Sequence, residues 1–531
     1  MIRPELVQQL ACPSFGLATS WIISRKGIPA ESLDEVQRNF RRELWPFSKS
    51  PATKDNTRAK KLREQANECY RKPPTELDIA LRKYNESISH AVDGSEDLAL
   101  GYANRSAVYF NRKQYHRCIR NIELAKANGY PKDKMEKLLE REKKCLAQLK
   151  EHDLATKETQ SKESTYDFNI SDIPGYGRGL TASKDFKVGD VVLREHPVLV
   201  VLEPEVTYTR CAACGVENEF DLIPCKHCVL AMYCSEKCRL DAYELYHRYE
   251  CEIMQDLAHL FRGPKPTRMF LLTLRLFWLV MTDLMKNPAD FMHRFEKNLN
   301  KYRDPRNVNP TGIHLHVLSN PRPNMTEDRT GEGVSQFLTV LIYNIAIVGN
   351  SSIEEQICKD YQTLLLDVLY RLMQQAKQIC DQSMSGVTCY YPFLQLVNHS
   401  CAPNTERFTT AGLESCLVTK RPILAGEQIT MCYFPNGSSD VMSKDKRQTQ
   451  LQKEFSFTCH CLGCTLDYPL LSAIEENTEL QCELQSINTS EESPNVLRAL
   501  EDFIQRHDNQ YPQKELAQAW SMYRERIIEH L

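Results

Sequence analysis

Cysteine and histidine side chains in the middle of the 531-residue chain have the spacing of metal ligands. The pattern over residues 211–251 is C-x2-C-x10-C-x2-C-x5-C-x3-C-x8-H-x3-C. Zinc prefers four thiolate or imidazole ligands, so eight of them predict two closed, structural sites with no position for a reacting water. The sequence alone leaves the pairing open. The predicted ligands are Cys211, Cys214, Cys225, Cys228, Cys234, Cys238, His247 and Cys251.

A second cysteine group lies near the C-terminus and is one ligand short. Cys459, Cys461 and Cys464 supply three thiolates, so a fourth ligand must come from elsewhere. Cys401, in the string NHSCAPN at 398–404, is the obvious candidate. A zinc ion shared in this way would pin the tail segment against the core that contains this string, which gives the remote cysteine a physical purpose.

Composition limits the remaining interpretations. Hydrophobic residues make up 42% and charged residues 26%, which is typical of a globular protein with a sizeable core. The formal net charge of -3 gives no basic footprint, so we expect no strong direct binding of nucleic acid. The longest apolar stretches are far shorter than the roughly 20 residues that span a bilayer. We therefore expect no membrane segment. No signal peptide is apparent either, so we expect residence in the nucleus and cytoplasm.

Periodicity predicts helices before the cysteine cluster. Apolar residues recur at helical spacing over 59–150, most clearly at 98–111, 114–128 and 134–149. Two helix-turn-helix units of about 34 residues favour a tetratricopeptide-like array, and a plain helical bundle is the alternative. A charged linker at 151–164 follows. Short β-type runs then lie at 189–193, 198–202, 414–419 and 428–433, with a helix-rich stretch at 252–385.

Four sequence strings, two of which contain cysteines named above, follow one another along the chain. They are GYGRGL at 175–180, NHSCAPN at 398–404, GEQITMCY at 426–433 and FSFTCHCLGC at 455–464. In this order they resemble a SET domain split by a MYND zinc finger, as in the SMYD family of protein-lysine methyltransferases. The helical repeats resemble its tetratricopeptide-bearing branch. The resemblance covers about residues 59–465.

The resemblance implies an α+β fold: a β-rich SET core split by a double-zinc finger, with a helical module before it and a helical tail after it. The expected boundaries follow the chain. They are 1–58 N-terminal extension and linker, 59–150 repeats, 165–210 first part of SET, 211–251 MYND finger, 252–385 helical insert, 386–434 SET core, 445–465 post-SET zinc segment and 466–531 C-terminal helices.

The resemblance also implies the ligands. In the family the finger ligands interleave, so that Cys211, Cys214, Cys234 and Cys238 hold one zinc ion while Cys225, Cys228, His247 and Cys251 hold another. With the tail site, three structural zinc ions are expected. The cofactor is S-adenosyl-L-methionine. Its implied contacts are Tyr176, Gly177, Arg178, Asn344, Asn398, His399, Tyr433, Phe455 and Phe457.

Tyr433 is the residue that we assign to catalysis. Methyl transfer from a sulfonium to lysine needs a neutral amine, whose reference pKa is near 10.4. A phenol hydroxyl at the inner end of an apolar channel can orient the lone pair of that amine. Family members usually carry a tyrosine where this chain has Phe455. The missing hydroxyl could alter how many methyl groups are added, or leave the activity weak.

Two functions are therefore weighed. The first is a protein-lysine methyltransferase that acts on a protein substrate in the regulation of gene expression. The second is a catalytically weak or inactive adaptor. In either case the finger and the repeats are expected to bind protein partners, such as transcriptional corepressors or deacetylases. For His314 and His316 no partner cysteine or carboxylate is evident, so we expect a structural or exposed role.

Overall fold

A computed structural model describes most of the chain. The described residues are 53–72, 76–152, 166–253, 264–309, 311–320, 339, 341–347, 360–380, 386–434, 441–455, 457–487 and 494–528. The expected N-terminal extension lies outside them apart from residues 53–58, and the expected linker lies outside them from residue 153. Two compact units are present: an N-terminal unit (Met1–Gln160 with Leu199–Tyr390) and a C-terminal unit (Ser161–Val198 with Tyr391–Leu531). Within the described ranges, no helix has the length and apolarity to cross a membrane.

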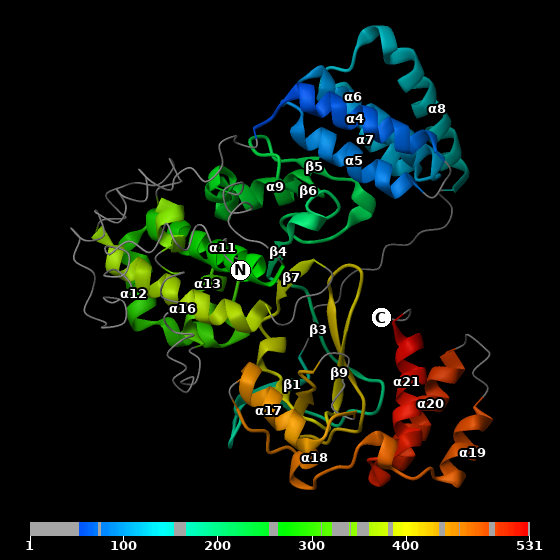
Figure 1. Cartoon of the computed structure of the whole chain (residues 1–531), viewed down its shortest axis with the longest axis vertical. Helices are drawn as coiled ribbons and strands as arrows, with labels where there is room; N and C mark the ends of the chain where they lie inside the picture. The colour runs from blue at the N-terminus through cyan, green and yellow to red at the C-terminus, as the bar shows by residue number, and fades with distance from the viewer. Residues whose placement is uncertain are drawn as a thin grey trace. The chain divides into compact units, whose positions relative to one another are not determined.

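The N-terminal unit begins with helices that pack in succession, coloured blue to cyan in Figure 1. Ser95 caps one of them by accepting a hydrogen bond from the Leu98 backbone N–H at 3.3 Å. A Cβ on Gly101 would lie 2.8 Å from Ile88, so two of these helices approach closely. The helices are α4 (Asn56–Arg71), α5 (Leu77–His90), α6 (Glu96–Asn111), α7 (Tyr115–Ala127) and α8 (Met135–His152).

The rest of this unit holds the cysteine-rich segment and a helical layer. Trp278, fully buried on α11, stacks on Tyr249 with ring centroids 5.1 Å apart. The antiparallel strands β4 and β7 pair beside these helices. The elements are β4 (Leu199–Leu202), β5 (Ile223–Pro224), β6 (Met232–Tyr233), α9 (Glu236–Ala242), a π-helical turn η5 (Tyr243–His247), α11 (Pro264–Lys286), α12 (Pro288–Lys297), α13 (Ile313–Ser319), α16 (Gln362–Cys380) and β7 (Val387–Tyr390).

The C-terminal unit contains two small sheets. One has the order β1-β2-β11-β8 and the other the order β3-β10-β9. Strand β8 runs parallel to β11, with Asn398 opposite Thr430 and His399 opposite Met431. The strands are β1 (Phe168–Ile173), β2 (Gly177–Ala182), β3 (Val191–Glu195), β8 (Asn398–His399), β9 (Thr405–Thr409), β10 (Ser415–Thr419) and β11 (Gln428–Met431).

The C-terminal helices are an integral part of this unit. Their buried faces form one apolar core with Val188, Phe408 and Val418, to which Leu500 and Phe503 contribute. Burial of these amphipathic faces against the strands is what holds the helices in place. Within the expected C-terminal helical region 466–531, the described residues contain helices that are part of this core rather than an appended tail. The helices of this core are α19 (Thr478–Ser486), α20 (Pro494–His507) and α21 (Lys514–Ile527). Two earlier helices, α17 (Lys444–Phe455) and α18 (Leu462–Thr465), contribute to a second cluster around Cys401.

Candidate active site and its cysteine clusters

The structure gathers the predicted metal ligands into three clusters of four. In each cluster the ligand atoms lie within 4.8 Å of one another. The groupings are the ones that the family resemblance implies, and four sulfur or nitrogen ligands are the set that structural zinc prefers. All three clusters can therefore hold zinc. They are Cys211, Cys214, Cys234, Cys238; Cys225, Cys228, His247, Cys251; and Cys401, Cys459, Cys461, Cys464.

The second finger cluster has a buried supporting layer that sequence reasoning missed. His247 Nδ1 lies 3.5 Å from Glu250 Oε2, and Arg275 binds both oxygens of Glu250 at 2.8 Å. Burial alone would raise the pKa of Glu250, but Arg275 outweighs it, together with His247, and lowers that pKa to about 2. A carboxylate behind a ligating histidine fixes its ring orientation, and Arg275 anchors this carboxylate to α11.

The helices of the N-terminal unit are bound to the finger through Asp221, which is 2% exposed. One carboxylate oxygen of Asp221 accepts from Arg105 at 3.2 Å and from Asn121 at 2.7 Å. The other accepts from Arg120 at 2.7 Å, and Arg120 also donates to the carbonyl oxygen of the ligand Cys234 at 2.8 Å. Arg105 is fully buried, so this hydrogen-bond network holds the helices and the finger in one arrangement.

In the C-terminal unit, the third cluster is contiguous with the predicted cofactor motif. The Tyr433 backbone N–H donates to His399 Nδ1 at 3.0 Å. Since Nδ1 accepts, the proton of the neutral ring is on Nε2, which lies 3.3 Å from Cys401 Sγ. The Cys401 N–H in turn faces Cys461 Sγ at 3.2 Å. His399 thus connects the cysteine cluster directly to the backbone of Tyr433.

Tyr433 is surrounded by aromatic rings. Its centroid lies 5.2 Å from that of His399, 5.1 Å from Phe455 and 6.4 Å from Phe457. The hydroxyl donates to the Val397 carbonyl oxygen at 2.8 Å. Burial raises the pKa of Tyr433 well above its usual range, so the group remains a neutral phenol. The hydroxyl proton of Tyr433 forms the hydrogen bond to Val397, so the lone pairs of the hydroxyl oxygen can accept a hydrogen bond from another group.

The glycine-rich turn at 175–180 lies against the same motif. Asn398 Nδ2 donates to the Arg178 carbonyl oxygen at 3.2 Å, and a Cβ on Gly179 would lie 2.5 Å from that nitrogen. Gly175 and Gly177 have φ values of +78° and +75°, and a Cβ at either would meet nothing within 4 Å. Close packing therefore requires glycine at 179, whereas the two other glycines face open space. Tyr176 between them is half-buried.

Glu195 is a buried carboxylate that sequence reasoning did not single out, and it supports the turn before Asn398. Glu195, at the end of β3, accepts from the backbone N–H groups of Phe393 at 2.9 Å and Leu394 at 3.0 Å. These residues lie at the start of the turn that leads into Val397 and Asn398. Burial raises the pKa of Glu195 to about 7, against the opposing effect of the two N–H groups.

The N-terminal unit contains three residues that the sequence analysis discussed: Asn344, His314 and His316. Asn344 is fully buried in the helical segment 341–347, and its assignment to the cofactor stays a prediction. His314 and His316 are also buried, which excludes the exposed role considered for them. His314 Nε2 lies 2.9 Å from Asp283 Oδ2, and His316 Nδ1 lies 2.5 Å from the Tyr302 carbonyl oxygen. The expected lack of a carboxylate partner is wrong for His314, because Asp283 comes from another helix.

The C-terminal unit contains two small sheets, a short parallel strand, a cysteine cluster next to that strand and a half-buried tyrosine. These features define the class of protein. Residues 177–434 match the family model "SET domain". The match spans both parts of the strand core as well as the finger and the helical insert between them. The chain therefore contains a SET domain interrupted by the cysteine-rich segment.

Similar proteins indicate which SET-domain proteins the chain resembles. It is 23% identical to "Protein-lysine N-methyltransferase SMYD4" of Danio rerio, over 80% of this chain and 67% of the relative. Identity to the protein of the same name from Mus musculus is 24%, over 84% and 72%. "Histone-lysine N-methyltransferase SMYD3" of Mus musculus is 27% identical over 54% of this chain and 59% of its own length. The chain thus contains a SET domain and is similar to SMYD proteins over most of its length.

Proposed function

We propose that this protein transfers methyl groups from S-adenosyl-L-methionine to lysine side chains of proteins. The observation that carries the proposal is the position of Tyr433, whose hydroxyl is oriented by Val397 among the rings of His399, Phe455 and Phe457. The matching SET domain and the names of the relatives agree with this activity.

The residues fit the cofactor. Gly175 and Gly177 expose backbone to open space, which leaves room for a ligand to approach the main chain closely. Asn398 has its amide nitrogen on the Arg178 carbonyl oxygen, so its amide oxygen can accept from an amino group. When bound, S-adenosylmethionine supplies an activated methyl group. Residues that we propose to hold it are Tyr176, Gly177, Arg178, Asn398, His399, Tyr433, Phe455 and Phe457, with Asn344 as a further contact.

The chemical role of Tyr433 follows from its hydrogen bond. An amine that donates N–H to the phenol oxygen has its lone pair turned away from that oxygen and available for an in-line displacement. Because its raised pKa keeps Tyr433 a neutral phenol, no phenolate is present to deprotonate the amine, and Tyr433 orients the amine instead. The aromatic walls disfavour the ammonium form of the entering lysine, which favours its neutral, reactive form.

Zinc is proposed to act structurally at the three clusters, because each already offers four protein ligands and no open position. The third cluster matters most for activity, since Cys401 lies two residues from His399. We further propose that the protein acts on gene expression from the nucleus and cytoplasm. Partners such as corepressors or deacetylases would bind through the finger and the helical module.

A second candidate function is a binding adaptor without methyl transfer. Phe455 favours it, because the ring lies 5.1 Å from Tyr433 and offers no hydroxyl to the substrate amine. The adaptor would keep the cofactor fold and the cysteine clusters but not the chemistry.

The test of the proposed methyl transfer measures which amino acid receives the label. The zinc-loaded full-length protein is incubated with methyl-labelled S-adenosylmethionine and a mixture of cellular proteins, and the proteins are then hydrolysed to amino acids. We expect label in methylated lysine. Gly177→Val is the control, because a branched side chain at a positive φ projects into the open turn and should remove both cofactor binding and label. Cofactor binding by the wild type without label in lysine would favour the adaptor.

A further inference from the structure

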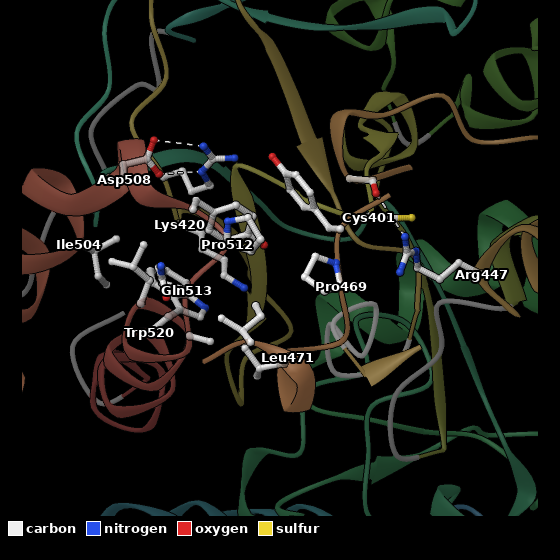
Figure 2. Close-up of a pocket in the computed structure, with 17 residues that line it drawn as sticks. Cys401, Lys420, Arg447, Pro469, Leu471, Ile504, Asp508, Pro512, Gln513 and Trp520 are labelled. Atoms are coloured by element: carbon white, nitrogen blue, oxygen red, sulfur yellow. Dashed lines mark hydrogen bonds and ion pairs between the residues drawn. The ribbon is translucent and has the colours of Figure 1, made fainter. Parts of the chain in front are cut away.

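A cavity of about 650 Å³, measured to its open mouth, lies in the C-terminal unit (Figure 2). Its walls come from the loop after β10, the segment after α18, and the loop and first turns that begin α21. Among its described lining residues, Cys401 is the only one that also belongs to the site around Tyr433. The cavity is therefore a separate place on the molecule, beside the third cysteine cluster.

Part of the charge at the cavity is already paired within the protein. Arg421 binds Asp508 through two hydrogen bonds of 2.7 and 3.1 Å, visible as dashed lines in Figure 2, and its guanidinium lies 4.4 Å from the centre of the Tyr511 ring. Arg447 is 3% exposed, and it donates to the Gly463 carbonyl oxygen at 3.3 Å beside the cysteine cluster. Arg421 is thus paired with a carboxylate, whereas the Nε atom of Arg447 is buried without a partner in the described chain.

Lys420 is a further cation of the cavity wall. Its ammonium lies 5.9 Å from the centre of the Trp520 ring, and no carboxylate within the described ranges forms an ion pair with it. Glu406 is engaged elsewhere, because it accepts from the Trp520 indole N–H at 2.5 Å and pairs with Arg524 at 3.0 Å. The cavity wall thus carries positive charge next to an aromatic surface.

Two further features point to the chemistry of an occupant. Gln513, Leu516 and Ala517 of the cavity wall belong to the beginning of α21, where no side chain caps the first turn. Uncapped backbone N–H groups at a helix N-terminus favour a carboxylate or another anion. The Gln513 Oε1 atom is buried without a hydrogen-bond partner in the described chain. It can accept a hydrogen bond from a peptide N–H.

We propose that this cavity binds a peptide segment of a partner protein in which a carboxylate lies beside a large apolar side chain. The carboxylate is placed by Lys420 and the first turn of α21, and a peptide N–H satisfies Gln513. The apolar side chain packs on the remaining wall, which is largely aliphatic and aromatic. That wall consists of Tyr468, Pro469, Leu471, Ile474, Ile504 and Trp520.

Fluorescence polarisation with the zinc-loaded full-length protein tests the proposal. The probe is a pool of fluorescein-labelled hexapeptides with glutamate fixed beside leucine or phenylalanine, and a matched pool has glutamine in its place. We expect the acidic pool to bind and the amide pool to bind at least about tenfold more weakly, as for loss of a charge-assisted hydrogen bond. Lys420→Met should weaken binding of the acidic pool by a similar factor.

Two variants separate the cavity from general effects. Lys446→Met removes an exposed lysine of α17 that does not line the cavity and should change nothing. Ala517→Trp fills the cavity and should abolish binding. Failure of the acidic pool to bind at millimolar concentration overturns the proposal, as does equal affinity of the two pools. Retained affinity in both Lys420→Met and Ala517→Trp would also overturn it. Methyl transfer measured on the same samples is independent of this cavity, so the two proposals can fail separately.

Discussion

Glu195 is the residue whose ionisation the fold opposes most clearly near neutral pH. Its carboxylate is buried under the turn at Phe393 and Leu394, and its pKa rises to about 7. The native state therefore holds this proton more tightly than the unfolded chain does, for which the value is near 4.5. Stability must fall as the pH rises through that interval, because the folded protein has to ionise a buried acid. Arg407 is the charged group that reduces this penalty.

We expect Glu195→Gln to remove this pH dependence. Between pH 5.5 and 8, the wild type should lose stability relative to the variant by on the order of 2 kcal/mol, since a carboxamide does not ionise. The measurement is the difference in Tm between the two proteins at each pH, which cancels groups that they share. A difference in Tm that stays constant over this range would show that Glu195 does not titrate there.

At the scale of elements, the main finding is that the helical module and the finger share a buried ionic network. Asp221 binds Arg105 and Arg120, and it lies on the finger, whereas both arginines lie on the helices. Removing one partner from such a network leaves a charge buried without compensation. That is more costly than the loss of an exposed pair.

Asp221→Ala should therefore destabilise the N-terminal unit by about 3–5 kcal/mol. Hydrogen exchange measured by mass spectrometry should rise in α5, α6 and α7. Asp241→Ala is the matched control, because Asp241 lies on the finger helix α9 and is 53% exposed in its ion pair with Lys237. In the Asp221→Ala background, Arg105→Met should recover part of the loss. Equal exchange in Asp221→Ala and Asp241→Ala would contradict the network.

The sequence predicted elements that depend on local pattern. The helix expected at 98–111 is observed as Glu96–Asn111, because Ser95 caps it where the apolar periodicity begins. The strand expected at 428–433 ends at Met431, because the Tyr433 N–H turns to the His399 side chain, 34 residues away. Asp221 could not be foreseen as buried, since its partners come from helices about a hundred residues earlier. Metal ligands could be foreseen because zinc chemistry imposes their spacing.

At the scale of the molecule, the cysteine clusters connect folding to activity. The third cluster joins Cys401 to the tail residues Cys459, Cys461 and Cys464, and His399 lies against its sulfur atoms. Metal bound there would stabilise a contact between segments that are about 60 residues apart, which the unfolded chain would not make. Loss of this metal should therefore reach the cofactor site.

Cys401→Ser tests this connection. We expect bound zinc to fall from three ions to two per chain by elemental analysis, and S-adenosylmethionine binding to weaken in titration calorimetry. Cys482→Ser is the control, because Cys482 is exposed and belongs to none of the clusters. Three zinc ions and unchanged cofactor affinity in Cys401→Ser would exclude Cys401 as a ligand.

The most direct measurement of the central claim is the single-turnover rate of methyl transfer to a lysine substrate by wild type and Tyr433→Phe. The variant keeps the ring among His399, Phe455 and Phe457 but loses the oxygen held by Val397. We predict a rate lower by roughly 100-fold or more, with S-adenosylmethionine affinity nearly unchanged, as when one preorganised polar group is removed from a reacting centre. Equal rates in the two proteins would contradict a catalytic role for the Tyr433 hydroxyl.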